Sequence, residues 1–157
     1  MKGTPMTAIN VLQSGRRYLK DQIDGLTEAQ LRRIPDGFNN NVIWHIGHLV
    51  ATQQLLHYRR AGLPLYVDDP FVDQFKNGTS PRSWQTDPDV DQILTLFTSL
   101  PEKLAQDHTD HRFGNAYDGF TTRSGFSLNN IDEAVIFNNF HEGIHTGYVM
   151  AMKKSIG

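Results

Sequence analysis

The sequence predicts an all-α fold, a single four-helix bundle domain that spans residues 1–157. Four segments repeat apolar residues at the three- and four-residue spacing of an amphipathic helix. Strand signals are weak, because the best candidate, residues 112–126, sets its aromatic residues among glycines. A connection of about 25 residues, 62–86, separates the second and third segments and is long enough to cross the bundle. We therefore expect these two helices to run parallel.

The first predicted helix covers residues 7–24. Gly25 follows it as a C-terminal stop, since glycine readily adopts the left-handed conformation that ends many helices. Thr27 and Gln30 have the three-residue spacing of a capping box, which opens one short extra turn. Pro35 ends that turn, because proline cannot continue a helix.

The second predicted helix begins at an asparagine cluster, residues 39–41, whose side chains suit an N-cap. It continues to Gly62 and contains the polar and aromatic stretch 44–48 in its first half. The long connection 62–86 follows and carries several aromatic and acidic side chains. A connection of this length is the place where a lid over a pocket is expected.

The third predicted helix opens at Asp87 and Pro88, a capping residue followed by the residue best tolerated at the first helical position. Pro101 lies inside its apolar pattern and predicts a kink or a split there. The fourth predicted helix starts between residues 127 and 130 and runs to Lys154. Acidic residues near its start and lysines near its end suit the helix dipole.

Composition limits the classes of function. Hydrophobic residues make up 38% of the chain and charged residues 20%, which is typical of a globular domain. The formal net charge of -2 gives no electrostatic reason to expect a nucleic-acid or membrane partner. No apolar run reaches the roughly 18 residues that span a bilayer, and no signal-peptide pattern opens the chain, so we expect a cytoplasmic protein. Because cysteine is absent, histidine and carboxylate side chains are the candidate metal ligands.

Two of the seven histidines, His141 and His145, lie four residues apart on the fourth predicted helix. This spacing puts both imidazoles on one helix face, where two ring nitrogens can reach the same metal ion. The alternative is a pair of partly buried histidines that make hydrogen bonds across the bundle. Burial of unpaired imidazoles costs desolvation free energy, and a shared metal ion removes that cost.

The same stretch, residues 141–145, also matches the His-Glu-x-x-His pattern of zinc proteases. That class needs a third ligand, which usually lies downstream. The residues that follow, 146–157, contain no histidine, aspartate or glutamate. The extended protease pattern also requires a glycine where this chain has Tyr148. We therefore expect no protease of this class, and a third ligand from upstream.

The best upstream source is the stretch that contains His45 and His48, three residues apart. Spacing alone does not choose between them. Gly47, which lies between them, costs about 1 kcal/mol in a helix interior relative to alanine, and this indicates close packing or access to a site. The remaining histidines lie at predicted helix ends or in loops, and we expect capping or core roles for them: His57, His108 and His111.

At these residues the sequence resembles the DinB-like superfamily, small bacterial four-helix-bundle proteins that are related to metal-dependent hydrolases. The resemblance is carried by NNVIWHIGHL at residues 40–49 and by HEGIHTG at 141–147. Residues 25–31 and 75–80 also resemble the family, and the similarity extends from residue 8 to about residue 152. It implies an up-down-down-up bundle, in agreement with the long second connection, and in many members a homodimer.

The family pattern places one metal-binding histidine on the second helix and two, four residues apart, on the fourth. Carried over residue by residue, the implied metal ligands are His48, His141 and His145, and His45 stays outside the set. The chain departs from the family at Tyr148, where glutamine is frequent.

The resemblance implies a divalent transition metal, zinc or nickel first, with open positions beside three neutral imidazoles. An ion of this kind lowers the pKa of a bound water or thiol. We therefore expect a metal-dependent enzyme with a small-molecule substrate, and first a transferase that uses a low-molecular-weight thiol as co-substrate. The alternatives are a metal-dependent hydrolase and a non-catalytic, metal-stabilised stress or interaction protein.

Overall fold

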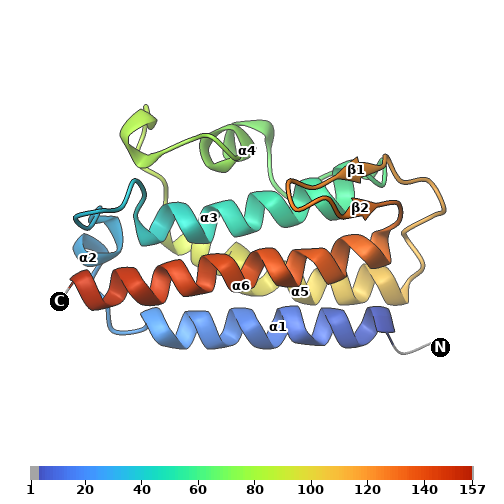
Figure 1. Ribbon diagram of the computed structural model, residues 1–157, viewed down its shortest axis with the longest axis horizontal. Coiled ribbons are helices and arrows are strands. Elements are labelled where there is room, and N and C mark those ends of the chain that lie inside the picture. Colours follow the sequence, from blue (N-terminus) through green and yellow to red (C-terminus); the bar gives the residue numbers. More distant parts are fainter. Residues whose placement is uncertain (1–3, 157) are drawn as a thin grey trace.

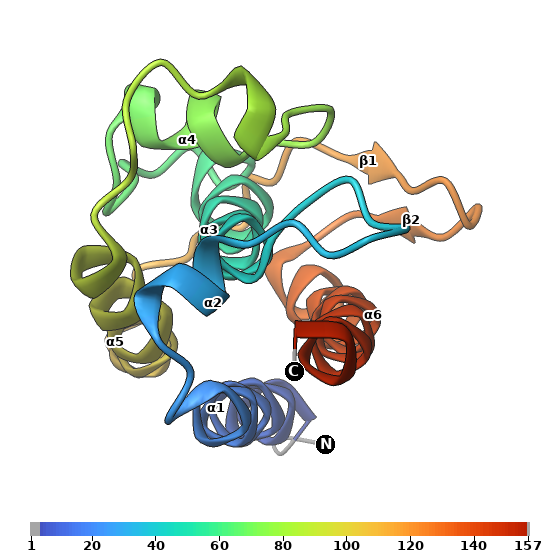
Figure 2. The ribbon, with the colours of Figure 1, turned by 90° about the vertical axis from the view of Figure 1, so that its left-hand side faces the viewer.

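The computed structural model describes residues 4–156 and is a bundle of four long helices (Figure 1). They are α1 (Thr4–Ile23), α3 (Val42–Gln53), α5 (Val90–Thr109) and α6 (Ile131–Ile156). Helices α1 and α6 run in one direction along the bundle, and α3 and α5 run in the other (Figure 1). Both α1 and α3 pack against α5 and α6, as the view along the bundle shows (Figure 2). The expected all-α bundle with up-down-down-up topology is confirmed.

Short elements occupy the connections, except for one π-helical turn, which continues α3 directly. They are α2 (Glu28–Arg32), the π-helical turn η1 (Gln54–Arg59), α4 (Asp69–Phe75), the 3-10 turn η2 (Pro81–Ser83), β1 (Phe120–Thr121) and β2 (Ser127–Leu128). The two strands form an antiparallel pair, with β1 inside the stretch of weak strand signals, residues 112–126, and β2 directly after it. Both α4 and η2 lie in the long connection, and α4 packs against α3 on the outside of the bundle (Figure 2).

Local sequence signals set the start of α2 and α3 as predicted. Thr27 and Gln30 form a complete capping box, in which the side chain of each residue accepts a hydrogen bond from the backbone N–H of the other. The side-chain oxygen of Asn41 accepts a hydrogen bond from the backbone N–H of Trp44 at 2.8 Å. This bond satisfies one of the donors that a helix start leaves open, and it fixes where α3 begins.

The start of α5 differs from the prediction by two residues. Its N-cap is Asp89, whose carboxylate accepts the N–H of Gln92 at 3.0 Å, and not Asp87. Pro88 therefore lies before the helix, where its carbonyl oxygen accepts a hydrogen bond from Arg32 at 2.9 Å. A tertiary contact with α2 thus holds Pro88 outside the helix that its sequence position favours.

Helix α5 is not split at Pro101, and it continues to Thr109. Proline has no N–H group for the carbonyl of Phe97, four residues earlier. Arg16 of α1 donates to that carbonyl oxygen from Nη1 at 3.0 Å. A buried side chain from another helix therefore satisfies the acceptor that proline leaves open, and the helix passes through this position.

The hydrophobic core fills the space between the four long helices and extends under α4. Its main cluster includes Ile46 of α3, Phe97 of α5 and Phe75 of α4, each fully buried. Phe75 thus anchors the long connection to the bundle, directly beside the stretch 44–48. In the part of the chain that the structure describes, no helix is long and apolar enough to cross a membrane.

Candidate metal centre

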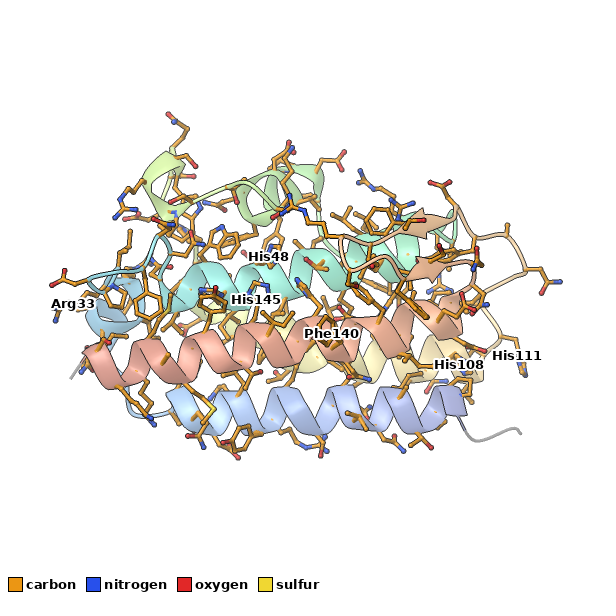
Figure 3. The ribbon with its side chains drawn as sticks, viewed as in Figure 1. Arg33, His48, His108, His111, Phe140 and His145 are labelled. Atoms are coloured by element: carbon orange, nitrogen blue, oxygen red, sulfur yellow. The ribbon has the colours of Figure 1, made fainter. Side chains whose placement is uncertain are left out.

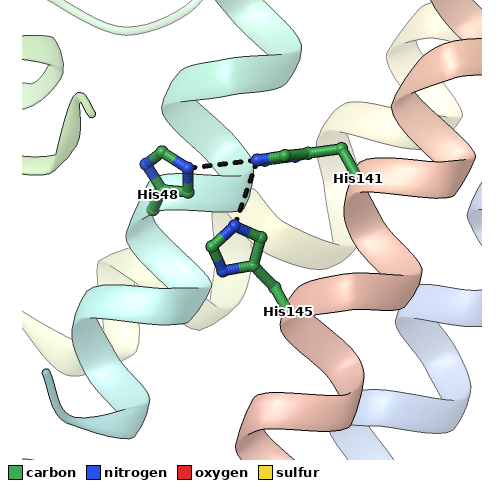
Figure 4. A group of neighbouring side chains, drawn as sticks. All are labelled: His48, His141 and His145. Atoms are coloured by element: carbon green, nitrogen blue, oxygen red, sulfur yellow. Dashed lines mark hydrogen bonds between the residues drawn. The ribbon is translucent and has the colours of Figure 1, made fainter. Parts of the chain in front are cut away.

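Three histidine side chains from two helices point toward one another between α3 and α6 (Figure 4). His48 comes from α3, and His141 and His145 come from successive turns of α6. Nε2 of His141 lies 3.2 Å from Nε2 of His48 and 3.1 Å from Nε2 of His145. The structure thus brings His48 together with two histidines that lie more than 90 positions later in the sequence.

The geometry and chemistry of this donor set fit a first-row divalent metal ion. Nitrogens that bind one tetrahedral ion at about 2.1 Å lie about 3.4 Å from one another, close to the observed separations. Imidazole is a good ligand for zinc and for nickel alike. Hydrogen bonds are a poorer explanation, because the single proton that a neutral His141 carries on Nε2 can serve only one of its two neighbours at a time.

Helix α4 orients His48. Nδ1 of His48 donates to the carbonyl oxygen of Phe75 at 2.8 Å, and since a carbonyl can only accept, the lone pair of Nε2 is left toward the other two histidines. The ring of Trp44 stacks on the His48 ring, with centroids 4.6 Å apart and an interplanar angle of 10°. A side chain at Gly47 would overlap the ring of Phe75, so α4 can approach only a glycine here. The interpretation of Gly47 as a close-packing residue is confirmed.

The long connection also supports the site through Trp44, whose Nε1 donates to Oγ1 of Thr79 at 2.9 Å. A cavity of about 630 Å³ lies farther along the connection, between α4 and α5, and Phe71 and Trp84 are among its lining residues. None of the three histidines lines this cavity. The connection therefore contacts α3 beside the histidine cluster, and the cavity that it lines is separate from the cluster.

All three histidines are neutral at physiological pH. Burial is the main cause, and the neighbouring histidines add to it: the pKa of His141 falls to about 3 and that of His145 to about 2. Burial also lowers the pKa of His48, although its hydrogen bond to Phe75 opposes the shift. Neutral imidazole is the form that binds metal, so burial keeps the three rings in the protonation state that metal binding requires.

Glu142, between the two α6 histidines of the cluster, is held in the core. Its carboxylate accepts hydrogen bonds from Nε and Nη2 of Arg16, the shortest at 2.7 Å, and Arg16 is only 1% exposed. Burial raises the pKa of Glu142, and the Arg16 charge opposes that shift. A zinc-protease base must reach the metal-bound water, and Arg16 instead holds this carboxylate in the core. The geometry therefore agrees with the exclusion of a protease.

A fourth histidine, His45, touches the cluster although the predicted ligand set leaves it out. Its Nδ1 lies 2.8 Å from Nδ1 of His145, on the side of that ring away from His141. Its own ring stacks on Tyr148, with centroids 5.6 Å apart and an interplanar angle of 18°. The signal for this contact was the three-residue spacing of His45 and His48, which places both on one side of α3.

The other histidines lie outside the cluster, as expected. His57 is fully buried in η1, where burial and then the nearby Arg16 charge lower its pKa to about 3. His108 and His111 lie at the far end of the bundle from the cluster (Figure 3). Nε2 of His108 is 3.5 Å from the carboxylate of Asp132.

Comparison with known proteins gives a family and a fold. The family model of the DinB superfamily matches residues 12–149, a range that contains all three histidines of the cluster. Among solved structures, the fold is similar to that of YfiT from Bacillus subtilis, described as a probable metal-dependent hydrolase with an unusual four-helix bundle topology. The TM-score is 0.62 at 16% sequence identity, over 98% of this chain and 88% of YfiT. No curated protein matches the sequence significantly.

Proposed function

The chain belongs to the DinB superfamily, and from this premise we propose that it is an enzyme that binds zinc or nickel through His48, His141 and His145. The observation that carries the proposal is the convergence of three Nε2 atoms on rings that burial keeps neutral. The fold shared with a probable metal-dependent hydrolase supports a metal-dependent activity.

Transfer of a low-molecular-weight thiol to a small electrophile is the reaction we place first. A bound ion supplies Lewis acidity, which lowers the pKa of a thiol or a water at an open position. The residues of the chain favour the thiol, because the donor set contains no carboxylate and Glu142 is held by Arg16. Water needs a base to take its proton, whereas a thiol, with a pKa near 8.5, ionises easily. The proposed compartment is the cytoplasm, where such thiols stay reduced.

Metal-dependent hydrolysis is the second candidate, and the fold shared with a probable hydrolase favours it. The two candidates differ in what the reaction consumes. A transferase loses activity when the thiol is left out, whereas a hydrolase cleaves esters or amides without it. A metal-stabilised stress or interaction protein would bind the ion and show neither activity.

The test is a conjugation assay on the zinc- or nickel-loaded protein with a chromogenic electrophile and a panel of bacterial thiols. With at least one thiol, we expect the loaded wild type to catalyse conjugation faster than the His48→Ala variant, which lacks one ligand. His111→Gln is the matched control, because it also removes a histidine but lies outside the cluster. If the loaded wild type and His48→Ala give equal rates with every thiol, transferase activity is rejected. A panel of model esters and amides then decides between hydrolysis and the non-catalytic alternative.

We also propose that the protein acts as a homodimer through the outer faces of α1 and α6. Large apolar side chains are exposed on these two adjacent helices. They are Val11 and Tyr18 on α1, and Ile136, Phe140, Ile144 and Tyr148 on α6. The four on α6 are spaced four residues apart and form one stripe, and Phe140 is 58% exposed (Figure 3). Such a stripe is typical of a surface that packs against a second copy.

Light scattering tests the proposed dimer. It should give a dimer for the wild type and a monomer for Phe140→Asp with unchanged helix content, and a monomeric wild type would reject this surface.

A further inference from the structure

The metal ligand His145 makes a contact on each of its two ring nitrogens. Nε2 faces His141 at 3.1 Å, and Nδ1 faces Nδ1 of His45 at 2.8 Å. A separation of 2.8 Å between two imidazole nitrogens requires a proton between them. If His145 carries that proton, its Nε2 presents a lone pair to the cluster. If His45 carries it, the proton of a neutral His145 sits on Nε2 and blocks metal binding.

We propose that His45, held by Tyr148, is a positioning residue. Its Nδ1 accepts a hydrogen bond from Nδ1–H of His145, which keeps the proton of His145 on Nδ1 and leaves the Nε2 lone pair toward the metal. The inference rests on the metal site of the proposed function. His45 does for His145 what the carbonyl of Phe75 does for His48: each accepts an Nδ1–H at 2.8 Å. Outer partners of this kind fix the tautomer and the ring orientation of metal-binding histidines.

Aromatic contacts from three segments hold the His45 ring in place. Tyr148 of α6 stacks on one face, and Trp44 meets the ring edge-on, with centroids 5.2 Å apart and an interplanar angle of 87°. Phe38, in the loop before α3, in turn contacts the Tyr148 ring edge-on at 6.5 Å. His45 is 4% exposed, so neither ring rotation nor solvent competes easily with the bond to His145.

The same contacts give a role to Tyr148, the position at which the sequence departs from the family pattern. Tyr148 lies three residues after His145 on α6, and its ring reaches across to α3. It is 53% exposed, so burial in the core does not account for its ring. The ring packs flat on His45, a contact that a glutamine at this position, which has no ring, cannot make.

Zinc titration against a chromophoric chelator tests the positioning role. His45→Phe keeps a flat ring against Tyr148 but removes the acceptor, and we expect zinc affinity to fall about 10–100-fold. His45→Gln keeps an acceptor and should recover part of that loss. Tyr148→Leu removes the stacked ring and should weaken zinc binding less than His45→Phe does. His108→Gln is the control for loss of a histidine outside the site, and far-UV circular dichroism with a chelator present checks that each variant is folded.

Long-range proton–nitrogen NMR of the metal-free protein reads the tautomers directly. We expect His145 to carry its proton on Nδ1 in the wild type and to populate the Nε2 tautomer in His45→Phe, a change that a purely structural role would not produce. Equal zinc affinity in wild type and His45→Phe would overturn the positioning role and leave the metal site intact. A wild-type His145 protonated on Nε2 would do the same. A folded wild type that binds no zinc would overturn both the positioning role and the metal-dependent function.

Discussion

Two polar regions of this bundle begin at neighbouring residues of α6 and have opposite chemistry. His141 faces His48 and His145 in a cluster of neutral rings, whereas Glu142 faces Arg16 in the core and forms a buried ion pair. In the core, each charge is cancelled by its partner. In the cluster no side-chain charge is present, because burial lowers the pKa of all three histidines. The difference explains why only the cluster has lone pairs available for a cation.

In the core region, hydrogen bonds to neighbouring helices satisfy the Arg16 guanidinium. Besides Glu142, the Arg16 guanidinium donates to the carbonyl oxygens of Leu49 and Phe97, each at 3.0 Å. One arginine thus links α1 to α3, α5 and α6. The core pair therefore links the four long helices, whereas the three cluster histidines stay neutral.

The largest expected effect is on the amount of metal bound per chain, which should fall for a substitution in the cluster but not for one in the core pair. His141→Ala should abolish the binding of one zinc or nickel ion per chain, since two remaining ligands hold an ion poorly, while the helix content is retained. Glu142→Gln should keep the stoichiometric ion and lose stability, because the Arg16 charge is left buried without its partner. The measurements are metal analysis after dialysis and urea unfolding in the presence of a chelator. Loss of metal in both variants would show that the cluster depends on the ion pair.

The next effect is on stability. Arg16→Met should lower the free energy of unfolding by about 3–5 kcal/mol, because it leaves the Glu142 carboxylate buried and unpaired. It also removes the donor for Phe97 beside Pro101. Urea unfolding of the metal-free protein measures this. The double variant Arg16→Met, Glu142→Leu should be more stable than the single variant, since the unpaired charge is gone, and a double variant as unstable as the single one would contradict the argument.

A smaller effect connects the long loop to the metal. Gly47→Ala should displace Phe75 and withdraw its carbonyl from Nδ1 of His48, and we expect zinc affinity to fall about tenfold or more. Gly143→Ala is the matched control, because a side chain at Gly143 meets open space on α6. Competition titration with a chelator measures both. Equal affinity in the two variants would mean that the cluster does not depend on the approach of α4.

Local signals predicted most of the fold. Capping at Thr27 and Asn41 and the spacing of His141 and His145 depend on residues within one turn of each other, so the sequence displays them directly. The family resemblance then supplied His48, which no local spacing could select over His45.

The features that sequence reasoning missed depend on contacts between distant residues. Pro101 does not split α5, because Arg16 of α1 donates to the Phe97 carbonyl oxygen that the proline leaves without a partner. His45 meets His145 only through the packing of α3 on α6, 100 residues apart in sequence. Glu142 follows His141 directly in the sequence, and only the structure shows the partner that holds it in the core, Arg16.

The smallest effect tests whether a neutral histidine in the core behaves as the cluster histidines do. His57 is fully buried, and burial and the Arg16 charge lower its pKa from 6.5 to about 3. Between these two pH values the unfolded chain binds one more proton at residue 57 than the folded chain does, so stability falls as the pH falls below about 6.5. Each such histidine contributes up to about 1.4 kcal/mol per pH unit.

We therefore expect His57→Gln to flatten the pH dependence of the unfolding free energy between pH 6 and about pH 4, by at most about 1.4 kcal/mol per unit. Urea unfolding at several pH values in chelator measures the slope, and the His111→Gln variant should keep the wild-type slope. Saturating zinc should raise stability but leave the slope unchanged over this range, because burial already keeps the cluster histidines unprotonated in the metal-free folded chain, and it should not alter the His57 contribution. A His57→Gln slope equal to that of the wild type would show that His57 gains a proton in the folded core, and the contrast between a closed core and an open cluster would then fail at this residue.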